Sequence, residues 1–274
     1  RTSLAVTSWA WLPKMRSIRV TASASRPCRA ERSPVSCESA ASAPRTLNGS
    51  NPVLESTKGD LGLRDPFVLR SKEGDRFFLI ATDLSAARKG FPTDHGSRYL
   101  EIWESTDLVN WGEKRHIEVS PPSAGMTWAP EAHYDPTIDA YVVYWSSRLF
   151  LDDAHTQEDG NGPQILMATT RDFVTFTPAE PYIKSGDIEG LRKTNAGLID
   201  TTILERDGVY YRFTKGTEES ACRPDIVAEK GTDLRAPSSS NAWMKFDTCL
   251  SANAGLPETE GPSAFRSNPG DING

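Results

Sequence analysis

The chain has 274 residues, of which 37% are hydrophobic and 25% charged, and this is enough to bury a sizeable core in one large or two small domains. Its most apolar runs, such as Phe77–Ala81 and Tyr141–Trp145, have only the length of strands, so the sequence predicts no membrane span. The net charge of −6 is opposite to the charge that a nucleic-acid backbone attracts, so nucleic acid is not an expected partner.

The first part of the chain differs in character from the rest. Residues 1–50 are rich in Ser, Ala and Arg, contain only two acids, and show no alternation or helical stripe that would bury a face. We expect residues 1–58 to be disordered or the remnant of an upstream segment, and residues 59–274 to form the folded domain. The run Leu4–Leu12 is too broken by small polar residues to predict a secretory signal.

From Leu61 onwards the pattern predicts strands and turns. Short runs rich in β-branched and aromatic residues are separated by turn signals such as Asp207-Gly208, and no long segment has apolar residues at helical spacing. The class is therefore predicted to be all-β. The predicted strands are Phe67–Leu69, Arg76–Thr82, Tyr99–Glu104, Ala140–Ser146, Ile165–Thr169, Thr202–Leu204 and Val209–Thr214.

The strands belong to a repeat of about 65 residues, each unit containing four strands. Acids at the heads of the units, Asp65, Glu131 and Asp200, lie 66 and 69 residues apart, and Glu260 follows after another 60. Repeats of four strands are typical of β-propeller blades, whose innermost strands line a central channel. We therefore expect these four acids to meet at the axis.

A group of carboxyl groups at one place points to glycoside hydrolysis. One carboxylic acid protonates the departing oxygen, and a carboxylate accepts a proton from water on the opposite face of the sugar. A third carboxylate raises the pKa of the acid by repulsion between like charges.

Four short motifs carry a resemblance to a known family: Arg64-Asp65-Pro66, Trp128-Ala129-Pro130-Glu131, Ile199-Asp200 and Glu260-Gly261-Pro262. Their order and spacing, over residues from about 61 to 274, resemble those of glycoside hydrolase family 43. The resemblance implies a five-bladed propeller that inverts the configuration of the anomeric carbon.

The resemblance also implies roles for individual residues. Asp65 corresponds to the general base, Asp200 to the residue that modulates the pKa of the acid, and Glu260 to the general acid. Trp128 and Glu131 are expected to bind substrate. The implied substrates are arabinose- or xylose-containing oligosaccharides and polysaccharides. The motifs favour an α-L-arabinofuranosidase or arabinanase over a β-D-xylosidase.

Alternatives from neighbouring classes stay open at this point. Enzymes of the invertase and levansucrase type also carry an Arg-Asp-Pro motif, but in their second blade and with retention of configuration. A non-catalytic carbohydrate-binding propeller would bind sugar without needing Asp65 or Glu260. The resemblance implies an extracellular enzyme that needs no cofactor, although the family often holds a calcium ion in the channel through a region expected after residue 274.

The length of the repeat predicts an incomplete ring. Five blades need a little over 300 residues, so the chain is expected to hold about three blades and the start of a fourth, and to have weak activity or none by itself. The four histidines show no metal-ligand spacing, so no metal site is predicted. A disulfide between Cys222 and Cys249 and a pair of unrelated thiols are both compatible with the sequence.

Overall fold

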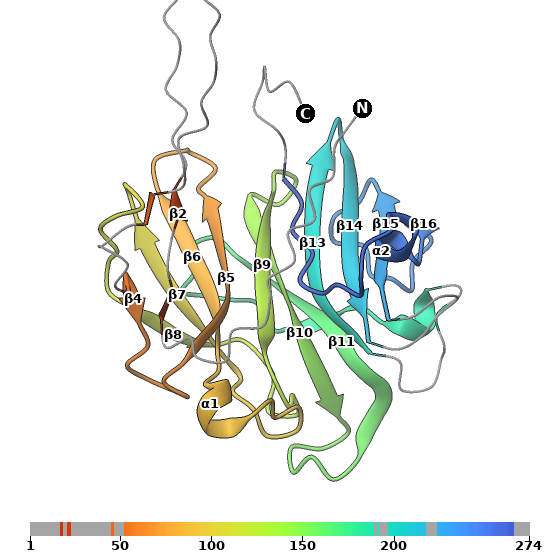
Figure 1. Ribbon diagram of the computed structural model, residues 1–274, viewed down its shortest axis with the longest axis horizontal. Coiled ribbons are helices and arrows are strands. Elements are labelled where there is room, and N and C mark those ends of the chain that lie inside the picture. The colour runs from red at the N-terminus through yellow and green to blue at the C-terminus, as the bar shows by residue number, and fades with distance from the viewer. Residues whose placement is uncertain are drawn as a thin grey trace, which may run out of the picture.

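The computed structural model describes residues 17–18, 21–22, 45–46, 52–188, 191, 197–217 and 224–265. Over these residues the regular secondary structure is almost entirely β-strand (Figure 1), which confirms the predicted all-β class. The helical elements in this part are single turns, α1 (Ala86–Lys89), α2 (Leu250–Asn253) and a 3-10 turn at Ser185–Asp187. No helix in the described ranges is long and apolar enough to cross a membrane.

The longer strands form three four-stranded antiparallel sheets, which we call blades I, II and III. Each blade takes its strands in chain order, so neighbouring strands are joined by local connections. Blade I contains β5 (Leu63–Arg70), β6 (Phe77–Asp83), β7 (Tyr99–Ser105) and β8 (Arg115–Glu118). Blade II contains β9 (Trp128–Asp135), β10 (Ala140–Phe150), β11 (Glu158–Thr170) and β12 (Glu180–Ile183). Blade III contains β13 (Leu198–Arg206), β14 (Val209–Gly216), β15 (Ile226–Gly231) and β16 (Trp243–Asp247).

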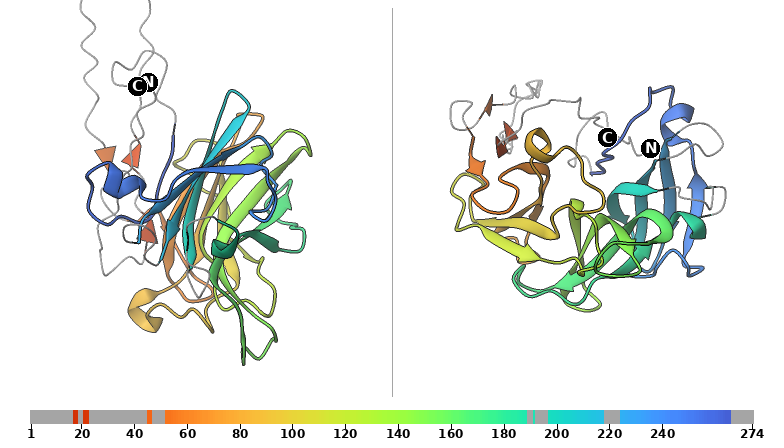
Figure 2. Two further views of the ribbon diagram at one scale, coloured as in Figure 1. Left: turned by 90° about the vertical axis from the view of Figure 1, so that its right-hand side faces the viewer. Right: turned by 90° about the horizontal axis from the view of Figure 1, so that it is seen from below.

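The three blades are arranged side by side around a common axis, as the view from below shows (Figure 2, right). The first strands of the blades form the inner wall, in which β9 contacts both β5 and β13. Four two-residue strands lie outside the blades, with β1 (Ser17–Ile18) pairing with β4 (Leu54–Glu55) and β2 (Thr21–Ala22) with β3 (Arg45–Thr46). This radial arrangement is the one that the repeat predicts.

Strand β10 shows why the blades stack. Its residues are buried on both faces, so its sequence is a nearly continuous apolar run instead of an alternating one. Tyr141, Val143 and Trp145 pack into a core shared with blade I, whereas Val142 and Tyr144 pack into a core shared with blade III. The hydrophobic core therefore lies between successive sheets.

The two outward faces of the stack are covered differently. On blade I, Val53 and Leu54 of the preceding segment pack against Trp103 and Trp111. On blade III, Leu250 of α2 and Ala264 cover part of a cluster on β14 and β15. Parts of both outward faces are thus closed by segments that flank the blades.

All seven predicted strands are confirmed, and so is the predicted turn at Asp207-Gly208, where both residues have a left-handed backbone (φ 55° and 78°). Strands β8, β12, β15 and β16 were predicted only as members of the repeat, without positions. They are short and carry charged residues, so their own sequences give a weak strand signal.

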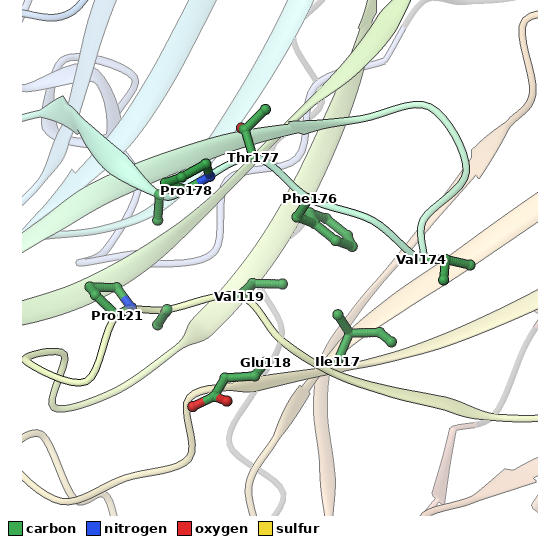
Figure 3. Close-up of a pocket in the computed structure, with 10 residues that line it drawn as sticks. Ile117, Glu118, Val119, Pro121, Val174, Phe176, Thr177 and Pro178 are labelled. Carbon is green, nitrogen blue, oxygen red and sulfur yellow. The ribbon is translucent and has the colours of Figure 1, made fainter.

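A groove of about 390 Å³ with a mixed polar and apolar lining lies on the outer strands, between β8 and residues 174–179 (Figure 3). Ile117, Val119, Val174, Phe176 and Pro178 are among its lining residues. None of the predicted site residues lines this groove, because they lie on the inner strands or, for Glu260, on the C-terminal segment.

Candidate active site

Each inner strand contains a β-bulge near its beginning. The residue at the bulge has a left-handed backbone in all three blades: Asp65 (φ 47°), Ala129 (φ 47°) and Asp200 (φ 51°). This conformation is unfavourable for residues with a side chain, and it redirects the bulged residue relative to the strand. Gly261, which follows in the C-terminal segment, also has a left-handed backbone (φ 62°).

The bulges correct the predicted alignment of the repeat. Asp65 and Asp200 are equivalent, as predicted, but the prediction that Glu131 shares their position is wrong, because Ala129 occupies it. Glu131 lies two residues further along β9. In the C-terminal segment Gly261, not Glu260, has the left-handed backbone of the bulge positions. A bulge adds one residue to a strand without any mark in the sequence, so the spacing of acids alone could not give this register.

Asp200 is held between two neighbours. Its backbone N–H donates to Ser146 Oγ of blade II (3.0 Å), and its Oδ2 accepts from the N–H of Gly261 (3.2 Å). Burial raises the pKa of Asp200 to about 7, and the negative charges of Asp65 and Glu260 add to the increase. The structure therefore brings the three acids of the predicted catalytic set within electrostatic range of one another.

Asp65 accepts a hydrogen bond from the hydroxyl of Thr82 on its Oδ2 (3.0 Å). Burial of the carboxyl group raises its pKa, whereas the neighbouring Arg64 and the Thr82 hydroxyl act in the opposite direction. Part of the Asp65 side chain reaches solvent, and we expect water there to limit the increase. Glu260 is also exposed, on the segment that follows α2.

Glu131 is partly buried, and burial raises its pKa to about 8. The charge of Asp200 adds to this, while hydrogen bonds from Thr202 and Tyr144 oppose it. The Tyr144 hydroxyl donates to Glu131 Oε2 at 3.4 Å. At neutral pH this side chain is therefore mainly a neutral carboxylic acid, which can donate a hydrogen bond as well as accept one.

Aromatic and cationic side chains from two blades meet beside these acids. The guanidinium carbon of Arg64 lies 5.0 Å from the centre of the Phe91 ring, and Phe91 meets Trp128 edge-on with their centres 6.1 Å apart. Phe91 is 46% exposed, whereas Trp128 is partly buried. Sequence reasoning missed Phe91 because it lies in a connection between α1 and β7 that has no repeat or motif.

One group of possible metal ligands occurs among the described residues, with ligand atoms within 4.8 Å of one another: Asp83, Glu101 and His116 on blade I. Glu101 already has two partners, since Lys114 Nζ lies 2.8 Å from one carboxylate oxygen and His116 Nδ1 lies 2.8 Å from the other. The ammonium group supplies the positive charge that a metal ion would bring. We interpret this group as a buried ion-pair network.

Cys249 is disulfide-bonded, so it is not a free thiol, and the alternative of two unrelated thiols is wrong for this residue. Cys222, its predicted partner, lies outside the described residues.

The blades are four-stranded and arranged radially, and carboxyl groups interact with one another beside their inner strands. This combination defines the class of propeller-type glycoside hydrolases. The chain belongs to the family described as a probable glycosyl hydrolase domain related to family 43, whose model matches residues 35–273. This confirms the resemblance that the motifs carry.

Similar proteins support this assignment. The chain is 36% identical over 255 residues to an α-L-arabinofuranosidase of Bifidobacterium longum subsp. longum, a match that covers 83% of this chain and 22% of that protein. The chain thus spans about a fifth of the length of this relative.

Solved structures show the same fold at low identity. The α-L-arabinanase of Penicillium chrysogenum, solved in complex with arabinobiose, superposes with a TM-score of 0.53 and 17% identity, covering 82% of this chain and 61% of that one. A structure described as a glycoside hydrolase gives a TM-score of 0.51 with 12% identity, covering 75% and 61% of the two chains.

Proposed function

We propose that the chain forms the catalytic part of an inverting glycoside hydrolase that releases arabinose from arabinose-containing oligosaccharides and polysaccharides. The observation that carries the proposal is the electrostatic interaction among Asp65, Asp200 and Glu260, which come from two blades and the C-terminal segment. The α-L-arabinofuranosidase from Bifidobacterium longum and the fold of the arabinanase support the choice of sugar.

The three acids take the roles that inversion requires. Asp65 accepts a proton from a water molecule whose oxygen attacks the anomeric carbon. The bond from that carbon to the glycosidic oxygen breaks, and the leaving oxygen takes the proton of Glu260. Asp200 interacts electrostatically with both groups, and its Oδ2 accepts a hydrogen bond from the N–H of Gly261 next to Glu260, so it takes the modulating role.

Trp128, Phe91 and Glu131 shape the place where the sugar binds. The exposed face of Phe91 and the indole of Trp128 offer apolar surface to a sugar ring. Glu131, neutral at pH 7, donates a hydrogen bond to a sugar hydroxyl. The reaction needs no cofactor in this scheme, because carboxyl groups supply both proton transfers.

The complete catalytic domain is proposed to be a five-bladed ring, of which the described chain contributes blades I to III and the segment carrying Glu260. The proposed location is extracellular. The disulfide at Cys249 supports it, since structural disulfides persist in oxidising compartments.

Hydrolysis of 4-nitrophenyl α-L-arabinofuranoside and 4-nitrophenyl β-D-xylopyranoside tests the proposal, with proton NMR to identify the anomer formed first. We expect arabinoside cleavage with inversion from the protein with its complete ring, and weak cleavage or none from the 274-residue chain alone. Asp65→Asn should lose activity by about a thousandfold or more. Glu260→Gln should lose much less with this activated leaving group than with arabinobiose, because 4-nitrophenolate departs without protonation.

The matched control is Asp207→Asn, which changes an acid that is exposed in a turn and also has a left-handed backbone. It should leave turnover unchanged. A product of retained configuration would contradict the inverting scheme, and faster cleavage of the xyloside would shift the assignment to a β-D-xylosidase.

A further inference from the structure

Thr82 lies at the junction between blades I and II. It lies near the end of β6, directly opposite Arg64 in the pairing of β5 with β6, and its side chain is fully buried. The bulge that carries Asp65 begins at this pair. Thr82 is therefore next to a predicted catalytic acid without touching solvent.

The hydroxyl of Thr82 makes two hydrogen bonds whose directions are fixed by chemistry. It accepts from the backbone N–H of Ala129 in blade II (2.8 Å), so its own hydrogen is available to Asp65 Oδ2 (3.0 Å). A hydroxyl that accepts from one group donates more strongly to the next. Donation to a carboxylate oxygen favours the ionised form that a general base needs.

We propose that Thr82 is a positioning residue for the reaction, which holds the carboxylate of Asp65 ionised and correctly oriented and fixes it to the bulge of blade II. The inference rests on the proposed function, in which Asp65 is the base. Thr82 itself contacts neither the water nor the sugar in this scheme, so it acts through Asp65.

The next junction between blades supports this interpretation. Ser146 pairs with Trp128 as Thr82 pairs with Arg64, and its hydroxyl accepts the backbone N–H of Asp200 at 3.0 Å. In blade III the corresponding residue is Lys215, whose ammonium donates to the carbonyl oxygen of Pro224 instead. A hydroxyl therefore stands at the two junctions where one blade holds the bulged residue of the next.

Other charged groups also act on Asp65. Arg64 lies beside it on β5, Asp200 acts from β13, and Glu260 acts from the C-terminal segment. Substituting Thr82 leaves all three in the chain, so a change in the titration of Asp65 reports the loss of the hydroxyl.

The test compares Thr82→Val and Thr82→Ala with Thr82→Ser. The carboxyl pKa of Asp65 is measured by carbon-13 NMR in protein labelled at Asp, with Asp65→Asn assigning the signal, and the pH profile of kcat/KM is measured on the aryl arabinofuranoside. We expect Thr82→Val to raise the pKa of Asp65 by about one unit and to move the acidic limb of the profile equally. KM should change little. Thr82→Ser should restore the wild-type pKa of Asp65 and the wild-type position of the acidic limb.

Thr170→Val is the matched control. This threonine is also buried, and its hydroxyl accepts backbone N–H groups in a turn of blade II, so its loss destabilises the fold without touching an acid of the site. It should lower Tm and leave both the Asp65 titration and the pH profile unchanged.

An unchanged Asp65 pKa in folded Thr82→Val, or in Thr82→Ala if valine prevents folding, overturns the inference. A shift as large in Thr170→Val also overturns it. If the wild-type protein with its complete ring cleaves no arabinoside, the proposed function fails, but the NMR titration still decides whether Thr82 controls the ionisation of Asp65.

Discussion

Glu131 is the acid whose titration should be most visible in stability. Its pKa is raised to about 8 in the fold, whereas an unperturbed Glu titrates near 4.3. Between these values the folded protein binds more protons than the unfolded chain, so the free energy of unfolding falls as pH rises. Glu131→Gln removes this titration, worth about 3.5 kcal/mol over this range, so we expect Tm to drop less between about pH 5 and about pH 8, by roughly 7–14 °C.

Thermal unfolding followed by circular dichroism at several pH values measures this effect. Asp207→Asn, on an exposed turn, should reproduce the wild-type pH dependence. If Glu131→Gln shows the full wild-type loss of Tm, the carboxyl group is not neutral in the fold at pH 7.

Asp200 should contribute its own titration to the activity profile. Burial raises its pKa to about 7, and the charges of Asp65 and Glu260 add to the increase, so Asp200 becomes negatively charged only as the pH rises through about 7. Asp200→Asn removes this titration, and we expect kcat to fall by at least tenfold and its pH profile to lose the inflection near pH 7. Kinetics over a range of pH check this, and an inflection that stays in place would assign Asp200 a purely structural role.

For individual residues, the sequence predicted site residues where short motifs exist. Asp65, Asp200 and Glu260 stand in short motifs at blade spacing, and the structure brings their charges together. Phe91 and Thr82 could not be predicted, because one lies in a connection and the other looks like any strand threonine. Their relevance depends on contacts between residues far apart in the chain.

The bulge of β9 leads to a test at the level of a strand. Ala129 has a left-handed backbone, which costs a residue with a side chain about 1 kcal/mol or more, so Ala129→Gly should stabilise the protein by about 0.5 kcal/mol. Ala132, on the same strand, is buried without a left-handed backbone, and Ala132→Gly should cost about 1 kcal/mol. Urea unfolding measures both, and equal destabilisation would contradict the account of the bulge.

Blade III contains a buried ion pair that joins β14 to β15. Arg212 Nε lies 2.7 Å from Glu229 Oε2, and the guanidinium packs over the rings of Trp243 (4.0 Å) and Tyr182 (5.4 Å). Arg212→Met should cost about 3–5 kcal/mol, because it leaves the Glu229 carboxylate buried without its partner.

The double variant Arg212→Met with Glu229→Leu should regain most of that loss, since a buried ion pair can be replaced by apolar side chains at little cost. Urea unfolding of the wild type, both single variants and the double variant completes the cycle. If the double variant is as unstable as Arg212→Met, the aromatic contacts of the guanidinium contribute more to the free energy of unfolding than the ion pair does.

Strands were predictable where burial imposes a pattern. β10 has apolar residues on both faces because a blade packs on each side, and its sequence shows this directly. β8 and β12 are outer strands with charged residues, so their strand structure comes from pairing with β7 and β11. Bulges were not predictable, because the extra residue changes the register without changing composition.

For the whole molecule, the order of the blades determines which surfaces are covered. Blade II has a neighbour on each side, whereas the outward faces of blades I and III are covered only by flanking segments in the described part of the chain. On blade III, Met244 and Phe246 lie on one face of the outermost strand and are 55% and 47% exposed. Phe246 meets Tyr211 and Phe213 edge-on at the margin of the outward cluster.

This exposed apolar face should make the chain self-associate as its concentration rises. Met244→Lys should weaken the association by about tenfold and leave the free energy of unfolding within about 0.5 kcal/mol of wild type, because more than half of the methionine side chain is in water. Light scattering over a concentration series measures the association. Val109→Lys, at a residue of blade I with 57% exposure, should leave it unchanged. A monomer at all concentrations, or equal weakening by both variants, would show that this face has no special tendency to associate.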